Sequence, residues 1–311
     1  MRYLVTFSGA KLMPYEQFEI KEVGPRVWAA VARPGAGATS NAGIIDMGRT
    51  TLVYDTSLTP QGAKELRLAA RLLTNRDPTY VVNSHWHLDH TLGNRVLGGS
   101  TIMATERTRE LLEERGPPAT AEIGNPGWAL RTMDLQTQAA SEQRPAYLEE
   151  LQCEIAARRD LAAAKEFTEI RLPDQIFRDR HRFDGDRGVV VIEGAGHCES
   201  DSVVWVHDAE VLFTGDLVTI HCYPDLESAE IDRWSNALLR LEAAKPRVVV
   251  PGHGPVGGVE ALPGLRGYFQ WLRRRGVTFG SEMPAPPGIG DWRRPSNGQR
   301  NLKLWGSYGN G

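Results

Sequence analysis

The feature that most constrains this chain is a short run of metal-ligand side chains that follows an apolar stretch. Residues 84–90 supply three imidazoles and one carboxylate directly after the apolar residues 80–82: His85, His87, Asp89 and His90. Neutral imidazole nitrogen and carboxylate oxygen suit Zn²⁺, and the run contains no Cys, which argues against a thiolate-rich structural zinc site. The run therefore predicts that the chain holds metal.

Three more ligand-type residues stand far downstream, each after an apolar run. His197 follows residues 189–192, His253 follows residues 248–250, and Asp216 follows a third such run. Because apolar runs of this length are typical of buried strands, each ligand stands where a predicted strand ends. We expect the distant segments to converge on one edge of a sheet.

Composition excludes several classes of protein. The chain has 311 residues, of which 41% are hydrophobic and 24% charged, as in an ordinary globular protein. The net charge of −3 favours neither nucleic acid nor a polyanion as partner. No apolar run reaches the length of a membrane span, and the N-terminus lacks a signal-peptide pattern. Together with three sparse cysteines, which fit a reducing compartment, these features predict a cytoplasmic protein that binds neither nucleic acid nor membranes.

Apolar spacing predicts alternating strands and helices in two β-rich parts, with helices packed outward. The first part has expected strands at 27–31, 42–46, 51–55 and 80–82 and an expected helix at 60–73. The second has expected strands at 189–192, 202–206, 211–213 and 248–250 and expected helices at 231–244 and 267–275.

Between the two parts the sequence predicts a helical insertion at about 105–167. A first helix over 105–115 should end at Gly116, Pro117 and Pro118, and a longer helical stretch should break near Pro145. The insertion either pads the fold or forms a wall of the substrate pocket or a dimer contact. A homodimer therefore stays open. The tail 276–311, rich in Gly, Pro and Asn, should be irregular.

The seven ligand-type residues together resemble the metallo-β-lactamase superfamily. Its signature is His-x-His-x-Asp-His, followed by a distant His, an Asp and a final His, and this chain matches all of it in order. The resemblance covers roughly residues 20–260. It implies an α/β fold, a four-layer αββα sandwich over residues 1–275 that carries the helical insertion.

The resemblance also implies two metal ions. His85, His87 and His197 would hold the first, Asp89, His90 and His253 the second, and Asp216 would bridge them. Two Zn²⁺ are expected, with iron or manganese as alternatives. A hydroxide shared by the two ions would attack the substrate, and Asp89 would act as the catalytic residue that orients it and carries its proton.

Other side chains near the signature are weaker candidates. His221 and Tyr223 follow Asp216 closely and either contact a small-molecule substrate or pack within their loop. Cys198 stands beside a ligand and is expected to be a small buried filler. Asp55 ends a strand on the expected edge and is a candidate to support a ligand from behind.

The superfamily hosts many reactions, so several activities stay open. We expect a dinuclear zinc hydrolase of a small ester, lactone, thioester or cyclic amide. Flavodiiron-type members carry Glu where His87 stands, and dedicated β-lactamases tend to lack an Asp at position 216, which makes a β-lactamase the less favoured reading. Thioesterases usually have Thr in place of Cys198, and lactonases have a Tyr closer to the bridging Asp than Tyr223 is.

Two alternatives lie further from a dinuclear hydrolase. One is an iron-dependent persulfide dioxygenase, which needs a single metal. The other is a ligand-binding or regulatory member of the superfamily with a degenerate site, and the intact ligand set argues against it.

Overall fold

A computed structural model describes residues 15–183, 187–278 and 289–306. Its first sheet has seven strands, paired in sequence order. The first four strands form antiparallel pairs, and parallel pairing begins where β5 joins β4. The strands are β1 (Phe18–Gly24), β2 (Val27–Ala32), β3 (Ala42–Asp46), β4 (Thr51–Tyr54), β5 (Tyr80–Val82), β6 (Thr101–Thr105) and β7 (Gln175–Phe177).

The second sheet has five strands in the order β12-β11-β10-β9-β8. β9 and β11 are both antiparallel to β10, and β12 is parallel to β11. Therefore β9, β11 and β12 run in the same direction, and their carboxyl ends lie at one edge. The strands are β8 (Arg180–Arg182), β9 (Val189–Glu193), β10 (Ser202–Val206), β11 (Val211–Phe213) and β12 (Val248–Val250).

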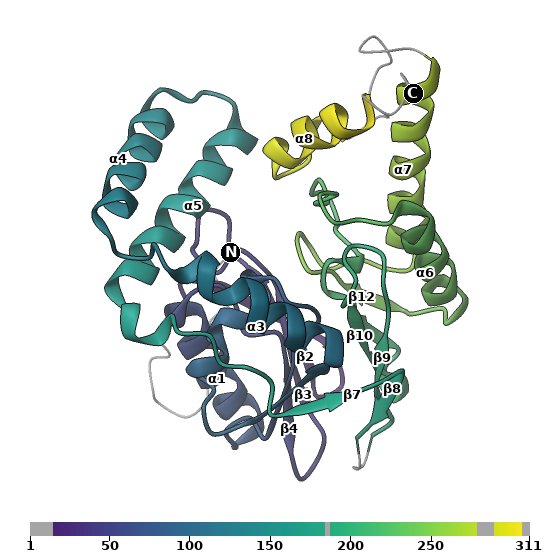
Figure 1. Ribbon diagram of the computed structural model, residues 1–311. Coiled ribbons are helices and arrows are strands. Elements are labelled where there is room, and N and C mark those ends of the chain that lie inside the picture. Colours follow the sequence, from purple (N-terminus) through teal and green to yellow (C-terminus); the bar gives the residue numbers. More distant parts are fainter. Residues whose placement is uncertain (1–14, 184–186, 279–288, 307–311) are drawn as a thin grey trace.

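The sheets face each other and helices cover their outer sides (Figure 1). A core that contains Tyr54, Val82 and Phe213 joins residues of both sheets. A second core packs the first sheet against α1 (Pro60–Thr74), and a third packs the second sheet against α6 (Ile231–Ala243) and α7 (Ala261–Thr278). These four layers confirm the predicted αββα sandwich.

Three helices lie between β6 and β7, where the insertion was predicted: α3 (Glu106–Thr120), α4 (Pro126–Ser141) and α5 (Pro145–Ala163). Pro145 takes the first position of α5, which needs no backbone N–H donor. The predicted end of α3 at Gly116 is wrong, because the helix continues through Pro117 and Pro118. The two prolines remove donors to the carbonyls of Glu113 and Glu114, and both residues are exposed, so water can replace those donors.

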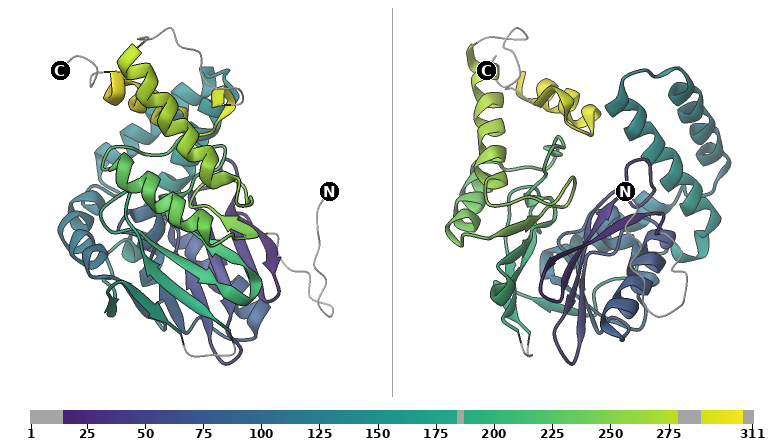
Figure 2. Two further views of the ribbon diagram at one scale, coloured as in Figure 1. Left: turned by 90° about the vertical axis from the view of Figure 1, so that its right-hand side faces the viewer. Right: turned by 180° about the vertical axis from the view of Figure 1, so that it is seen from behind.

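The predicted irregular tail is also wrong in part, because Pro295–Gly306 forms helix α8. Pro295 suits the first helical turn, and Leu302 of α8 packs against the core beneath α7. Figure 1 and the right-hand view of Figure 2 show α8 between α7 and the α4–α5 pair. The sequence also missed the strands β1, β6, β7 and β8. Residues 1–14, on which the signal-peptide prediction rests, lie outside the described residues.

Two short helices, α2 (Leu88–Thr91) and a 3-10 turn (Leu92–Arg95), follow β5, and α2 carries the ligand residues Asp89 and His90. Among the helices of the described residues, none combines the length and the apolar character that a membrane span needs.

Candidate metal centre

The ligand run begins where β5 ends, beside the neighbouring strand β4. Asp55, the residue after β4, donates its backbone N–H to the carbonyl of Val82 (2.9 Å), and its carboxylate accepts the backbone N–H of Ser84 (2.7 Å). Ser84 in turn accepts a hydrogen bond at its carbonyl from the N–H of Ser202 at the start of β10 (2.7 Å). The end of β5 is thereby tied to the second sheet.

All seven predicted ligand residues converge at this edge and form two groups. His85, His87, His197 and Asp216 offer ligand atoms within 4.8 Å of one another, and so do Asp89, His90 and His253. This is the division that the resemblance implies.

Asp216 lies between the two groups. Its Oδ1 is 3.2 Å from Nε2 of His90 and 3.2 Å from Nε2 of His253, and its Oδ2 is 3.8 Å from Nε2 of His197. Nε2 of His253 also lies 3.3 Å from Oδ2 of Asp89. One carboxylate therefore reaches imidazoles of both groups, as a bridging ligand must.

Four of the five imidazoles are held from behind at Nδ1, which leaves Nε2 to face the centre. Such bonds fix the tautomer and the ring orientation of a metal-ligating His. The pairs are His85 with Ser84 Oγ (2.8 Å), His90 with Asp55 Oδ2 (2.8 Å), His197 with Asp201 Oδ1 (3.1 Å) and His253 with the Thr39 carbonyl (2.9 Å).

Several buried atoms in the centre have no hydrogen-bond partner among the described residues. They are Nε2 of His85, Nε2 of His90 and Oδ1 of Asp216. His90 Nε2 and Asp216 Oδ1 are 3.2 Å apart but do not have hydrogen-bond geometry. Buried polar atoms are rarely left unpaired, so three of them at the centre fit metal ions that would coordinate them.

The protonation states of most of these groups also suit metal binding. Burial and the neighbouring imidazoles hold the pKa of His85 well below its usual value, and burial together with His197 lowers the pKa of His87 to about 4. Burial opposes ionisation of Asp89, but the charges of His90 and His253 outweigh it and hold the pKa of that carboxyl well below its usual range. Neutral imidazoles and ionised carboxylates are the forms that bind metal.

His90 and His197 behave differently. Burial opposes their charged forms, but the nearby carboxylates outweigh it and raise the pKa of both imidazoles well above the ordinary value. A metal ion would therefore have to displace a proton from each of these rings when it binds.

Two buried carboxylates support the ligands from behind. The prediction for Asp55 is confirmed by its bond to His90. Asp201, which the sequence analysis missed, pairs with His197 and also accepts the backbone N–H groups of Gly196 (3.0 Å) and Cys198 (2.9 Å). Its position four residues after the ligand His197 and directly before β10 could have identified it from the sequence as a supporting residue. Cys198 is buried against Asp201, as expected of a filler.

The two predicted substrate-binding residues lie beside the C-terminal segment. His221 is exposed, and its carbonyl accepts the N–H of Arg293 (2.8 Å). Tyr223 donates its hydroxyl to the carbonyl of Ile289 (2.7 Å) and packs its ring against Trp292. These contacts fit the loop-packing alternative for Tyr223. Substrate contact by either residue stays a prediction.

The C-terminal segment brings a further charged group to the centre. An Nη atom of Arg294 lies 3.7 Å from Oδ2 of Asp89, across 205 positions of sequence. No motif around Arg294 marks it, because its position depends on how the segment packs against α5 and the loop at His221. The sequence analysis therefore missed it.

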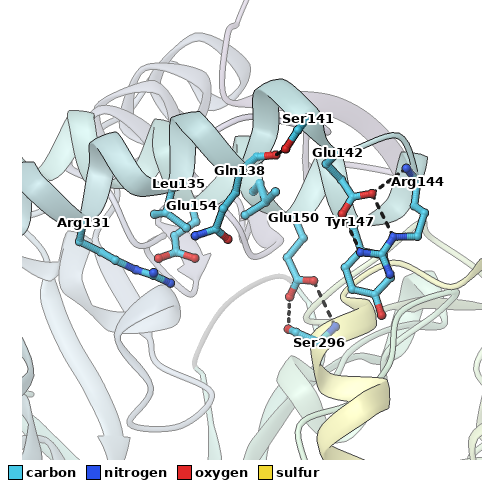
Figure 3. A pocket seen from close by; sticks show the side chains of 11 residues that line it. Arg131, Leu135, Gln138, Ser141, Glu142, Arg144, Tyr147, Glu150, Glu154 and Ser296 are labelled. Atoms are coloured by element: carbon cyan, nitrogen blue, oxygen red, sulfur yellow. Dashed lines mark hydrogen bonds and ion pairs between the residues drawn. The ribbon is translucent and has the colours of Figure 1, made fainter.

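A surface groove of about 420 Å³ lies between α4, α5 and the start of α8 (Figure 3). Its lining includes Arg131, Glu150, Glu154 and Ser296, and none of the seven ligand-type residues. The groove is therefore distinct from the metal centre, although Ser296 stands only two residues after Arg294.

Comparisons with known proteins agree with this geometry. The family model described as the metallo-beta-lactamase superfamily matches residues 36–253. A curated relative, the metallo-beta-lactamase type 2 of Bacteroides fragilis, is 32% identical over 74 residues, which span 22% of this chain and 30% of that protein.

Two solved structures illustrate the shared fold. A metallo-beta-lactamase from Pontibacter korlensis aligns with a TM-score of 0.60 and 20% identity, over 82% of this chain and 99% of that one. A metallo-beta-lactamase from Hirschia baltica aligns with a TM-score of 0.57 and 18% identity, over 81% of this chain and 97% of that one.

Proposed function

The chain belongs to the metallo-β-lactamase superfamily, and within it we propose that the protein is a dinuclear zinc hydrolase of small carbonyl substrates. The substrate class is an ester, lactone, thioester or cyclic amide. The observation that carries the proposal is the pair of ligand groups that share Asp216.

Two ions fit the ligands better than one. A mononuclear iron centre, as in a persulfide dioxygenase, would leave one group of buried ligand atoms without a cation. Leaving buried polar atoms unsatisfied is costly, and both groups contain orphaned atoms, Nε2 of His85 in one and Nε2 of His90 in the other. The predominance of imidazole suits zinc, and the absence of Cys from both groups fits a catalytic zinc site better than a thiolate-rich structural one.

When bound, the ions would lower the pKa of a water molecule and polarise the substrate carbonyl. The chain's own residues supply the rest. The bonds of Asp55, Asp201 and Thr39 to the imidazoles fix the directions of the ligands before substrate arrives. Asp89 is the most exposed of the four carboxylates, with 18% of its side chain accessible against 5% for Asp216, 2% for Asp201 and 1% for Asp55.

The exposure of Asp89 suits a group that must meet both water and substrate. Its Oδ2 lies 3.3 Å from Nε2 of His253, and its lowered pKa keeps it ionised and able to accept a proton. We assign it the transfer of that proton to the leaving group, a step that general acid–base catalysis typically accelerates by about 10²–10⁴-fold.

The test is turnover by zinc-loaded protein on a panel of esters, lactones, thioesters and β-lactams, with elemental analysis of the same sample. We expect about two zinc ions per chain and hydrolysis of at least one carbonyl class. One metal ion per chain together with oxygen consumption on a persulfide would instead establish the dioxygenase. Metal binding without any turnover would support a regulatory member.

A further inference from the structure

We propose that Arg294 binds a carboxylate of the substrate, so that the hydrolase selects an anionic substrate. The residue lies outside residues 36–253, to which the family model matches. The proposal rests on the proposed function, because it names the substrate class of the same site.

The guanidinium of Arg294 faces the centre with its donors unused. Within the part of the chain that the structure describes, its one ion pair is the 3.7 Å approach to Asp89, and it donates no hydrogen bond. Its neighbours on the segment differ: Arg293 donates to Glu149, and Arg300 donates to Asn297 and pairs with Asp225. A guanidinium has five N–H donors, and 32% of the Arg294 side chain is accessible to a ligand.

The segment that carries Arg294 is held on both sides. The N–H of Arg293 donates to the carbonyl of His221 (2.8 Å), and its carbonyl accepts the N–H of Tyr223 (3.0 Å). From α5, Glu149 accepts a hydrogen bond from the guanidinium of Arg293. Glu150, also on α5, accepts hydrogen bonds from the backbone N–H and the hydroxyl of Ser296 (Figure 3). The anchoring of both flanks positions the residue between them.

Arg294 itself has a strained backbone, with φ of 58°. A non-glycine residue adopts this left-handed conformation at a cost, which surrounding contacts must offset. The hydrogen bonds of the flanking residues maintain that conformation. The backbone of Arg294 is therefore fixed beside the centre, unlike that of a residue in an unanchored surface loop.

The charge of the centre makes an anion the fitting ligand. Two divalent ions carry more charge than the carboxylates of Asp89 and Asp216 can neutralise, so a centre that holds them is cationic. A guanidinium beside it is repelled by the net positive charge; Asp89 offsets part of this repulsion, and an anionic substrate would offset more of it. Arg294 is the one Arg or Lys of the described chain that pairs with any of the seven ligand-type residues. One planar guanidinium matches the two oxygens of one carboxylate.

The experiment measures how much a second carboxylate strengthens binding. Calorimetry on the zinc-loaded full-length chain compares glutarate with butyrate, since both offer one carboxylate to the metals and only glutarate offers another to Arg294. We expect wild-type protein to bind glutarate about tenfold more tightly, as one charge-assisted hydrogen-bonded pair allows. Arg294→Gln should abolish this preference, and Arg294→Lys should restore part of it.

Arg300→Gln is the matched control, because it removes a positive charge from the same segment and leaves the centre untouched. It should keep the tenfold preference. An equal preference for glutarate in wild type and in Arg294→Gln would overturn the proposal. Loss of zinc from Arg294→Gln would also overturn it, because Arg294 would then be needed to hold the metal ligands in place. Turnover on the carbonyl panel separates the two proposals, since an enzyme that hydrolyses a carbonyl but lacks the glutarate preference retains the function and refutes the role of Arg294.

Discussion

The two sheets contribute to the metal centre in different ways. The first sheet supplies four ligand residues from one loop after β5, spanning only six positions, His85 to His90. The second sheet supplies three, one from each of three loops after β9, β11 and β12: His197, Asp216 and His253. The four ligand residues of the first sheet are close together because they are close in sequence. The three of the second sheet come together only when β9, β11 and β12 are paired in register through β10.

Close packing of glycines marks the second sheet's contribution. A Cβ on Gly252 would lie 2.0 Å from Oδ1 of Asp216, and a Cβ on Gly254, whose φ is +96°, would lie 1.8 Å from the carbonyl oxygen of Ile220. The loop 84–90 contains no glycine. The distributed ligands thus depend on backbones that approach closely. The second sheet also packs closely against the compact run, because a Cβ on Gly215 would lie 2.6 Å from the Cβ of Ser84.

Asp89→Ala removes the carboxylate of the compact run and should have the largest effect. We expect kcat to fall by about 10²–10⁴-fold, because a positioned proton acceptor is lost, while the group of His85, His87 and His197 retains metal. Steady-state kinetics and elemental analysis on the same preparation check both parts. Asp134→Ala, which removes an exposed carboxylate on α4, is the control. Near wild-type kcat for Asp89→Ala would disprove the assigned role.

Gly252→Ala disturbs the distributed set without changing any ligand. The new methyl group would displace Asp216, so we expect a loss of about 1–3 kcal/mol in unfolding free energy and weaker metal retention. Thermal unfolding with and without zinc measures both. At Gly264 an added Cβ meets nothing within 4 Å, so Gly264→Ala should leave both quantities unchanged or slightly improved. Equal behaviour of the two variants would show that close approach at Gly252 is unimportant.

Asp55→Asn and Asp201→Asn test the two groups of metal ligands separately, because Asp55 holds His90 of one group and Asp201 holds His197 of the other. Each should weaken metal binding about 10–100-fold, since each carboxylate orients one imidazole. Loss should begin in the group of His90 for Asp55→Asn and in the group of His197 for Asp201→Asn. Chelator competition with Co²⁺-substituted protein, followed by its absorption spectrum, distinguishes the groups. Asp77→Asn alters only an exposed pair with Arg67 and serves as control. Identical spectra for the two variants would contradict the division.

His221→Ala should have the smallest effect. The side chain is exposed and its backbone carbonyl, which the substitution keeps, holds Arg293. We expect KM to change about twofold with unchanged metal content, as for most surface substitutions. Loss of zinc from this variant would instead make His221 a ligand.

The sequence predicted the parts of the centre that follow strand ends. Apolar runs identified β5, β9, β11 and β12, and the position of Asp55 after β4 was sufficient to predict its support of a ligand. Cys198 is buried, as the sequence predicted, and it forms with His197 and Asp201 a third group of ligand-type side chains.

The missed parts depend on tertiary contacts that no local pattern encodes. Arg294 reaches Asp89 only because Glu149 and Glu150 of the insertion hold the segment beside the loop at His221. Composition suggested an irregular tail, but α8 forms because Leu302 can pack beneath α7. The end of α3 was misplaced because proline costs less in a final, water-exposed turn than in a helix interior.

Asp216 belongs to the second sheet and reaches His90, which belongs to the first. An ion held by both residues would fasten the two sheets together, in the manner of a removable crosslink. Separating the sheets would first require releasing that ion, so occupancy would add to the free energy of unfolding by mass action. Metal supply in the cell would then set the lifetime of the folded chain as well as its chemistry.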